Sequence, residues 1–326
     1  MTLHFYDVGQ GLAVLVDLPD GRHVLVDTAD GPRREGCGDV CAHSHSHLLE
    51  RLHADLGTAP IDMLWITHQH SDHIGGAPDV LSELPVTLYV DNGRGDRKGE
   101  VRRAHEAATA RGTQMRVVDP AHPDPPLRGS PNVGLVPVVP PAWPRSCEGH
   151  GERGDRGEHG ERGGDENECS IALRIDYCRS SVLLTGDAEH EEEKLLEPGR
   201  ATLLQVGHHG SDTSTSAALL GKVRPLYAVV SAGKRDEGLN RDYCHPRARV
   251  VQRLSRVLDA DALAAGQPAA GGDASSATLT AFDGTRCDRA TDAEWVAVPV
   301  SDRLWATERD GDVVLVTTGD GVFTRR

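Results

Sequence analysis

The sequence predicts a mixed α/β fold in which helices cover β-sheets and polar residues gather along one sheet edge. Residues 3–27 have the pattern of a meander of two or three short strands, with a Pro19-Asp20-Gly21 turn before the last one. Residues 77–118 alternate between helical and strand patterns, which indicates βαβ units with helices over a sheet. Histidines and aspartates follow several apolar runs, so we expect them to meet at one edge of a sheet sandwich.

The length of 326 residues fits one large domain spanning residues 1–326. Two stretches interrupt the regular pattern. Residues 145–168 are rich in glycine and charge and contain His-Gly-Glu-Arg-Gly twice, and residues 259–290 are rich in Ala, Gly, Ser and Asp. Such segments bury too little apolar surface to offset the entropy of ordering, so both are predicted to be flexible insertions.

Composition restricts the possible classes of protein. A formal net charge of −15 argues against a protein that coats duplex DNA with a basic face, although it does not exclude a nuclease that binds metal ions. The sequence contains neither a secretory signal pattern nor an apolar run long enough to span a membrane. Seven scattered cysteines do not indicate a disulfide framework, so a cytoplasmic protein is expected.

Further elements are assigned from their patterns. A helix is expected to end near Leu56, and residues 120–144, which are rich in proline, are predicted to be an edge strand or a loop. A helix is predicted from Arg247 to about Leu258. Residues 303–315 have the pattern of a hairpin around Asp310-Gly311.

The segment from Thr67 to Gly76 is the strongest chemical signal. Three histidines and an aspartate fall between residues 68 and 73, directly after the apolar run 61–66. In an extended segment, side chains two positions apart point the same way, so His68 and His70 can converge on one cation. A turn at Ser71 would direct Asp72 and His73 to a second cation. The spacing therefore predicts half of a two-metal site.

Two later strands also end in residues that bind metals. Ser181–Leu184 is followed by Thr185-Gly186-Asp187, and Thr202–Val206 is followed by Gly207-His208-His209. The order of these residues and their placement at strand ends make chance clustering a weak explanation.

The HxHxDH pattern after a strand resembles the metallo-β-lactamase superfamily. Asp7-Val8-Gly9-Gln10-Gly11 and the run from His208 to Ser216 are similar to motifs of the hydrolase domain of ComEC-type competence proteins. This resemblance covers nearly the whole chain. It implies an αββα sandwich of two mixed sheets flanked by helices, and a site that holds two divalent ions, Zn²⁺ or Mn²⁺.

The resemblance also implies roles for individual residues. The implied metal ligands are His68 and His70 for the first ion, Asp72 and His73 for the second, Asp187 as the bridge, and His208 as the last ligand, with His209 as its alternative. Asp7 and Asp27 would support these ligands. The superfamily's usual histidine between HxHxDH and Gly-Asp has no counterpart here, because Asn167, Cys169 and Ser170 occupy that region. With fewer nitrogen ligands the first ion is held less tightly, which makes Mn²⁺ an alternative to Zn²⁺.

The implied catalytic residues are Asp72, Asp187, His245 and Lys234, and the implied substrate-binding residues are His209, Ser211, Ser214 and Lys234. Lys234 is expected to neutralise a phosphate group, and His245 to protonate the leaving oxygen or to contact phosphate. Cys244 departs from the family, which usually has glycine before this histidine.

A two-metal centre lowers the pKa of a shared water and clamps the attacking and leaving oxygens of a displacement. The sequence therefore predicts a phosphodiester hydrolase, and specifically a nuclease that acts on DNA through a metal-bound hydroxide. Two alternatives stay open. One is a small-molecule phosphodiesterase or phosphorylcholine-type esterase, and the other is a metal-binding scaffold without turnover.

A further metal hypothesis concerns the segment before the first long helix. Its candidate ligands are Cys37, Cys41, His43, His45 and His47. Cysteine pairs followed by histidines can bind structural zinc, but this spacing lacks the second half of a zinc finger, and the histidines can equally face water.

Overall fold

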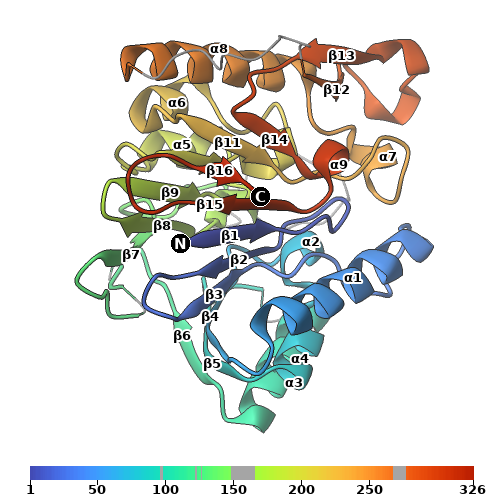
Figure 1. Cartoon of the computed structure of the whole chain (residues 1–326). Helices are drawn as coiled ribbons and strands as arrows, with labels where there is room; N and C mark the ends of the chain where they lie inside the picture. The colour runs from blue at the N-terminus through green and yellow to red at the C-terminus, as the bar shows by residue number, and fades with distance from the viewer. Residues whose placement is uncertain (96–97, 122, 126, 148–165, 267–276) are drawn as a thin grey trace.

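The computed structural model describes residues 1–95, 98–121, 123–125, 127–147, 166–266 and 277–326. Two large β-sheets pack face to face, and helices cover the outer face of each sheet (Figure 1). This is the αββα sandwich predicted from the sequence, so the fold class is confirmed.

The first sheet has eight strands in the order β16-β15-β1-β2-β3-β4-β5-β6. The predicted meander forms β1, β2 and β3, which pair antiparallel, and β3 to β6 then run parallel. The strands are β1 (Thr2–Phe5), β2 (Val14–Asp17), β3 (His23–Val26), β4 (Ile61–Trp65), β5 (Val86–Asp91), β6 (Gln114–Val117), β15 (Val313–Val316) and β16 (Thr324–Arg325).

The second sheet has six strands in the order β14-β11-β10-β9-β8-β7. They are β7 (Val133–Val138), β8 (Ala172–Tyr177), β9 (Ser180–Leu184), β10 (Leu203–Gln205), β11 (Tyr227–Val230) and β14 (Leu304–Ala306). The edge strand β7 contains Pro137, which has no N–H to donate and is therefore tolerated at a sheet edge. The proline-rich segment thus contains an edge strand, one of the two forms predicted for it.

Helices cover the outer face of each sheet. The first sheet is covered by α1 (Asp39–Leu56), α3 (Ala77–Glu83) and α4 (Gly99–Arg111), and the second by α5 (His190–Leu195), α6 (Ala217–Val223) and α8 (Ala248–Ala264) (Figure 1). The short elements are α2 (Ser71–Ile74), α7 (Asn240–Tyr243), α9 (Thr307–Asp310), η1 (Asn167–Cys169), η2 (Gly207–Gly210), η3 (Cys287–Arg289), η4 (Asp292–Glu294) and the hairpin β12 (Thr278–Phe282) with β13 (Trp295–Pro299). No helix in the described ranges is both long and apolar enough to cross a membrane.

Strand alternation builds the core between the sheets. Tyr227 and Val229 of β11 point into this central core, while Ala228 and Val230 point outward to the layer that contains α8. Trp65 at the end of β4 is fully buried in the central core, and its indole N–H donates to the carbonyl oxygen of Ile171 at 2.8 Å. This bond joins the first sheet to the segment that enters the second sheet, close to the edge that carries the polar residues.

Two predictions about the C-terminal third were wrong. The segment around Asp310-Gly311 is not a hairpin: β14 joins the second sheet beside β11, α9 follows, and β15 joins the first sheet beside β1. Much of the predicted insertion 259–290 is regular, because α8 continues to Ala264 and β12 begins at Thr278. The central parts of both predicted insertions, 148–165 and 267–276, lie outside the described residues.

The expectation about cysteines was also wrong. Three disulfides join Cys37 to Cys41, Cys147 to Cys169 and Cys244 to Cys287, and Cys178 is an exposed free thiol. Separations of 4, 22 and 43 residues give no sequence signal for pairing, because pairing depends on the folded geometry.

The first disulfide also removes the hypothesis of a structural zinc near α1. Cys37 and Cys41 are bonded to each other and have no thiolate to offer. Two histidines of this segment have carboxylate partners instead: His45 lies 2.9 Å from Asp79, and His47 lies 2.9 Å from Asp312.

We expect removal of the disulfide between Cys244 and Cys287 to destabilise the fold. A Cys244→Ser/Cys287→Ser double variant should lower the free energy of unfolding by about 2–4 kcal/mol, because it releases a constraint on the unfolded chain. Denaturant unfolding followed by circular dichroism measures this. The matched control is Cys178→Ser, which changes an exposed free thiol and should leave the midpoint unchanged. Equal midpoints for the double variant and the wild type would contradict the assigned bond.

Candidate metal centre

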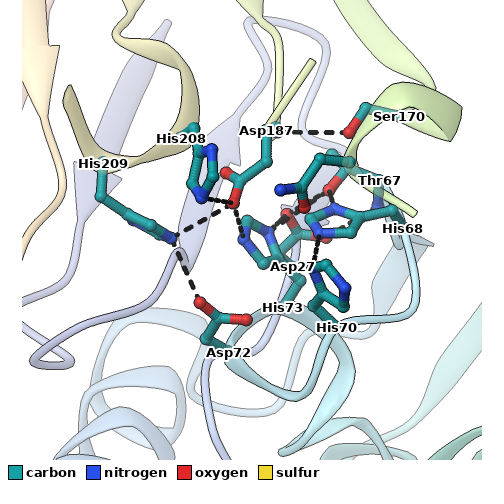
Figure 2. A network of polar contacts seen from close by, with 12 residues as sticks. Asp27, Thr67, His68, His70, Asp72, His73, Ser170, Asp187, His208 and His209 are labelled. Carbon is teal, nitrogen blue, oxygen red and sulfur yellow. Dashed lines mark hydrogen bonds and ion pairs between the residues drawn. The ribbon is translucent and has the colours of Figure 1, made fainter. Parts of the chain in front are cut away.

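The polar residues predicted from the sequence lie at the C-terminal ends of strands from both sheets. Asp27 follows β3, and β4 leads to His68 and then to α2, which carries Asp72 and His73. In the second sheet, Asp187 follows β9, and η2 follows β10. Because these strand ends meet at one edge of the sandwich, side chains far apart in sequence converge (Figure 2).

Four of these side chains form a buried cluster: Asp72, His73, Asp187 and His209. One ligand atom from each lies within 4.8 Å of all the others. The Nε2 atom of His73 is 3.2 Å from an Asp187 oxygen, and the Nε2 atom of His209 is 3.5 Å from the same oxygen. Burial alone would raise the pKa of Asp187, but the imidazoles of His73 and His209 hold it well below its usual range.

The hydrogen bonds around the cluster define which nitrogen atoms face its centre. The Nδ1 atom of His73 lies 2.7 Å from Asp27 Oδ2, and the Nδ1 atom of His209 lies 2.7 Å from the Ser231 carbonyl oxygen. Both partners only accept, so both Nδ1 atoms carry a hydrogen, and each neutral ring would present the lone pair of its Nε2 atom toward the centre of the cluster.

Three buried atoms at the centre, His73 Nε2, His209 Nε2 and Asp187 Oδ1, have no hydrogen-bond partner among the described residues. Leaving buried polar atoms unpaired is costly. A divalent cation bound by these inward-facing lone pairs would remove that cost, so the donor set fits a metal ion.

A second pair of nitrogens lies beside this cluster. The Nε2 atom of His68 is 3.1 Å from the Nδ1 atom of His70, and Thr67 Oγ1 lies 3.2 Å from the other ring nitrogen of His68. Two imidazole nitrogens this close can share one cation. The described part of the chain shows no group of three ligands around this pair, so the first position has fewer donors than the second.

Asp27 holds the ligand loop in place. This carboxylate is fully buried, accepts from the backbone N–H and the hydroxyl of Thr67 at 2.8 Å and 2.7 Å, and orients His73 as described above. It therefore connects the end of β3 to both the end of β4 and α2, in the supporting position that the sequence suggested.

The neighbouring histidines His208 and His209 differ in burial and in their other partners. Both have left-handed backbone angles, with φ of 47° and 53°, and the Nε2 atoms of both lie near Asp187 Oδ2. His209 is 1% exposed and enters the cluster, whereas the side chain of His208 is 18% exposed, with Nδ1 2.9 Å from Glu189 and Nε2 3.8 Å from Asp187. The sequence favoured His208 as the last ligand, but the geometry favours His209.

Comparison with known proteins agrees with this arrangement. Residues 6–234 match the model of the metallo-beta-lactamase superfamily. The chain belongs to this superfamily.

Relatives place the chain in a branch of the superfamily. Recombination protein 2 of Haemophilus influenzae is 28% identical over 260 residues, which cover 78% of this chain and 26% of that protein. ComE operon protein 3 of Bacillus subtilis is 26% identical over 285 residues, which cover 77% of this chain and 30% of that protein. Competence protein ComA of Neisseria gonorrhoeae is 28% identical over 254 residues, which cover 76% of this chain and 29% of that protein. These matches confirm the predicted ComEC-type competence branch, and the chain spans less than a third of the length of each relative. Among solved structures, the E377D mutant of CmlA β-hydroxylase overlaps with a TM-score of 0.47 and 16% identity, over 79% of this chain and 50% of that chain.

A buried serine lies next to the loop that carries Asp187. Ser170 lies just before β8, is fully buried, and its Oγ accepts from the backbone N–H of Asp187 at 3.3 Å. The serine therefore helps to position the loop that carries Asp187, at the place where the sequence analysis found no ligand.

Two glycines allow the loops of the metallo-β-lactamase site to approach each other. A Cβ atom on Gly75 would lie 2.3 Å from the backbone nitrogen of Gly31 and from the carbonyl oxygen of Ser71. A Cβ atom on Gly11 would lie 2.8 Å from the carbonyl oxygen of Asp72. Larger residues at these positions would push α2 away from the first sheet.

The serines predicted to bind substrate are largely turned inward. Ser214 is fully buried, and its hydroxyl donates to the carbonyl oxygen of Ala188 at 2.6 Å. Ser211 is nearly buried and lies 3.0 Å from the hydroxyl of Thr213. The expectation for Ser214 is therefore corrected, because its hydroxyl fixes the loop and is not available to a ligand.

Neither Lys234 nor Asp7 contacts the cluster in the part of the chain that the structure describes. Lys234 is exposed. Burial raises the pKa of the half-buried Asp7 carboxyl, and the charge of Lys234 opposes this effect. The backbone N–H of Asp7 donates to Asp312 at 2.8 Å, and no contact joins Asp7 to a metal-binding side chain in the described part of the chain.

His245 is buried beside the centre, and its ring centroid is 5.4 Å from that of His208. Gln10 fixes its tautomer: the Gln10 Oε1 atom accepts from Gly233 N–H at 3.2 Å, so the amide NH₂ faces His245 Nδ1 at 3.1 Å. Asn240 holds the backbone of His245 from both sides, accepting from its N–H at 2.7 Å and donating to its carbonyl oxygen at 2.6 Å.

Sequence reasoning assigned no roles to Gln10, Asn240 or Glu189, although two signals were present. Gln10 lies inside the Asp-Val-Gly-Gln-Gly motif, and Glu189 lies two residues after Asp187. Neither signal shows which side chain is contacted, because Gln10 contacts His245 and Glu189 contacts His208, and both histidines come from other segments of the chain.

Removal of the Asp27 carboxylate should weaken metal binding. In Asp27→Ala, His73 loses the acceptor that fixes its tautomer, and the donors of Thr67 are left unpaired, so the affinity for Zn²⁺ should fall by about 10–100-fold. Competition with a chromophoric chelator measures this. Asp20→Ala is the control, because Asp20 lies in the turn before β3 and pairs with Arg22. An unchanged affinity in Asp27→Ala would show that Asp27 does not support the site.

Proposed function

We propose that this chain is a metal-dependent phosphodiester hydrolase, and specifically a nuclease that acts on DNA. The observation that carries the proposal is the cluster of Asp72, His73, Asp187 and His209, in which His73 Nε2, His209 Nε2 and Asp187 Oδ1 are buried without a hydrogen-bond partner among the described residues. Relatives are named as a recombination protein and a competence protein, which supports a nucleic acid as the substrate.

Two ion positions follow from the donor atoms. The buried cluster would hold one ion, and His68 with His70 would hold the other, with Asp187 as the shared carboxylate. Zn²⁺ suits the histidine-rich set, and Mn²⁺ is an alternative at the position with fewer donors. When bound, such ions supply Lewis-acid polarisation of phosphoryl oxygens and a more acidic water.

The protein's own residues have separate tasks. Asp27 and Ser231 hold the ligand imidazoles in the tautomer that binds a cation. His245 accepts from Gln10 at Nδ1, so its Nε2 carries the hydrogen and can donate a hydrogen bond. Burial also lowers the pKa of His245, which keeps its ring neutral. Of the two roles predicted for His245, we therefore propose the contact with phosphate rather than protonation of the leaving oxygen. Lys234 would attract the anionic substrate from the surface.

A small phosphodiester is the second candidate substrate. A formal net charge of −15 disfavours a long polyanion, which normally binds through neutralisation of many phosphates by Lys and Arg. A small diester needs only the local positive charge of the metal centre.

Substitution of Asp187 should abolish turnover. In Asp187→Asn the shared carboxylate is lost, so the metal-reconstituted variant should not cleave single-stranded DNA, duplex DNA, RNA or bis-p-nitrophenyl phosphate. The wild type should be inactive after chelation and regain activity with Zn²⁺ or Mn²⁺. Asp176→Asn is the matched control, because Asp176 pairs with Arg174 on β8.

The substrate panel separates the candidates. Cleavage of oligonucleotides well above that of the model diester supports a nuclease, and the reverse supports a small-molecule phosphodiesterase. A wild type that binds metal but cleaves none of these substrates is a scaffold, and the proposed function is then wrong.

We also propose an oxidising compartment in place of the cytoplasm expected from the sequence. Three disulfides use six of the seven cysteines, and disulfides persist mainly where the surroundings are oxidising. Two of the bonds start beside residues of the site, because Cys169 precedes Ser170 and Cys244 precedes His245, and Cys37 packs against Leu239.

Thiol counting tests the compartment. Protein produced in an oxidising compartment should show one reactive thiol per chain after denaturation, from Cys178. Protein kept reduced should show all seven and unfold at a lower denaturant concentration. A reduced protein that is as stable and as active as the oxidised one would argue for the cytoplasm.

A further inference from the structure

The first ion position, between His68 and His70, has one ligand that lies at the surface. The side chain of His70 is 38% exposed, whereas His73 and His209 of the buried cluster are at most 1% exposed. Figure 2 shows the ring of His70 beside that of His68, with 3.1 Å between His70 Nδ1 and His68 Nε2. An exposed side chain keeps more rotamer freedom than a buried one. A further contact is therefore needed to keep His70 Nδ1 turned toward His68.

The ligand histidines of the buried cluster are oriented through the ring nitrogen that faces away from the ion. Asp27 Oδ2 lies 2.7 Å from that nitrogen of His73, and the Ser231 carbonyl oxygen lies 2.7 Å from that of His209. Histidines that bind metals generally donate their second N–H in this way. The corresponding nitrogen of His70 is Nε2.

Glu166 faces the Nε2 atom of His70. One carboxylate oxygen, Glu166 Oε2, lies 3.6 Å from His70 Nε2, which is an electrostatic contact rather than a hydrogen bond. When Nδ1 binds a cation, the hydrogen of the neutral ring is on Nε2 and faces this carboxylate. The attraction between the ring and Glu166 then grows, because the ring becomes more positive. Glu166 therefore occupies the place at His70 that Asp27 occupies at His73.

Lys98 holds Glu166 beside His70. The Nζ atom of Lys98 donates to Glu166 Oε2 at 2.5 Å and to the carbonyl oxygen of Gln69 at 3.2 Å. Gln69 is the residue between His68 and His70, and it is 1% exposed. One ammonium group thus fixes both the carboxylate that faces His70 and the backbone that carries it.

This pair connects segments that are distant in sequence. Lys98 directly precedes α4, Glu166 directly precedes η1, and Gln69 follows β4 in the ligand loop. The loop before α4 lies close to Gln69, because a Cβ atom on Gly95 would be 3.0 Å from Gln69 Cγ. The side chains of Lys98 and Glu166 are 29% and 25% exposed, so solvent screens their ion pair only in part.

We propose that Glu166 and Lys98 are positioning residues of the first ion position. Glu166 orients His70, and Lys98 holds both Glu166 and the ligand loop. This inference rests on the two ion positions of the proposed function and adds to them two residues from outside the ligand motif. The pair should affect only one of the two ions, because the buried cluster has its own support from Asp27 and Ser231.

Zn²⁺ binding tests the proposal without any need for turnover. Titration of the metal-free wild type against a chromophoric chelator should resolve two binding steps. Glu166→Gln and Lys98→Met should each weaken one step by about 10–100-fold and leave the other unchanged. At a free Zn²⁺ concentration that just saturates the wild type with two ions, metal analysis of either variant should find fewer than two ions per chain.

A charge exchange separates positioning from a purely structural ion pair. The double variant Lys98→Glu/Glu166→Lys restores opposite charges between α4 and η1 but places an ammonium beside His70. Its denaturant midpoint should stay near that of the wild type, while the weakened Zn²⁺ step stays weakened. Recovery of that step would show that the pair only joins segments, and would overturn the inference.

Glu100→Gln is the control for the loss of one negative charge. Glu100 lies in the first turn of α4 and pairs with Arg103, so this variant should change neither step. A wild type that binds a single Zn²⁺, or a Glu166→Gln variant with either no weakened step or both steps weakened equally, would overturn the inference. A wild type that binds two ions and cleaves no diester, with one step dependent on Glu166, would overturn the proposed function and leave the inference standing.

Discussion

The buried carboxylate of Asp27 is the interaction on which the metal centre depends most. It follows β3 in the first sheet, accepts from Thr67 after β4, and fixes the ring of His73 in α2. A buried charge is stable only when its oxygens are paired, and here every partner belongs to the ligand loop. The same three bonds that satisfy Asp27 therefore set the tautomer of a metal ligand and the path of the chain between β4 and α2.

The second sheet supplies the other two side chains of the cluster, and a hydrogen bond from a neighbouring strand end again fixes the histidine. Asp187 and His209 follow neighbouring strands, and Ser231 after β11 fixes the tautomer of His209. The bond from Trp65 to Ile171 holds the two sheets together near this edge. His73 and His209 are thus each oriented by a residue from an adjacent strand end, which explains why the site can be precise although most of its residues lie on loops.

Much of this arrangement could be predicted from the sequence, because local patterns encode it. Apolar runs bounded by turn residues predicted β1 to β6, and the spacing of His68, His70, Asp72 and His73 after a strand predicted a metal site. The parts that could not be predicted depend on tertiary geometry. Whether His208 or His209 enters the metal cluster depends on the left-handed backbone conformation of both residues. Which of the six cysteines form disulfides with each other depends on distances in the folded chain. The Asp310-Gly311 turn resembles a hairpin locally, but its flanking strands pair with β1 and β11.

The position of β15 has a consequence for the order in which the fold can form. β1 lies between β2 and β15, and the Met1 amino group donates to the carbonyl oxygen of Thr317, 316 residues away. During synthesis, β1 to β6 can assemble as soon as they emerge, but the outer edge of β1 stays unpaired until β15 is made. An unpaired strand edge is a site of aggregation, and closing so long a loop is slow. Pairing of β15 with β1 therefore also covers a strand edge that is open to aggregation until the C-terminal part of the chain has been made.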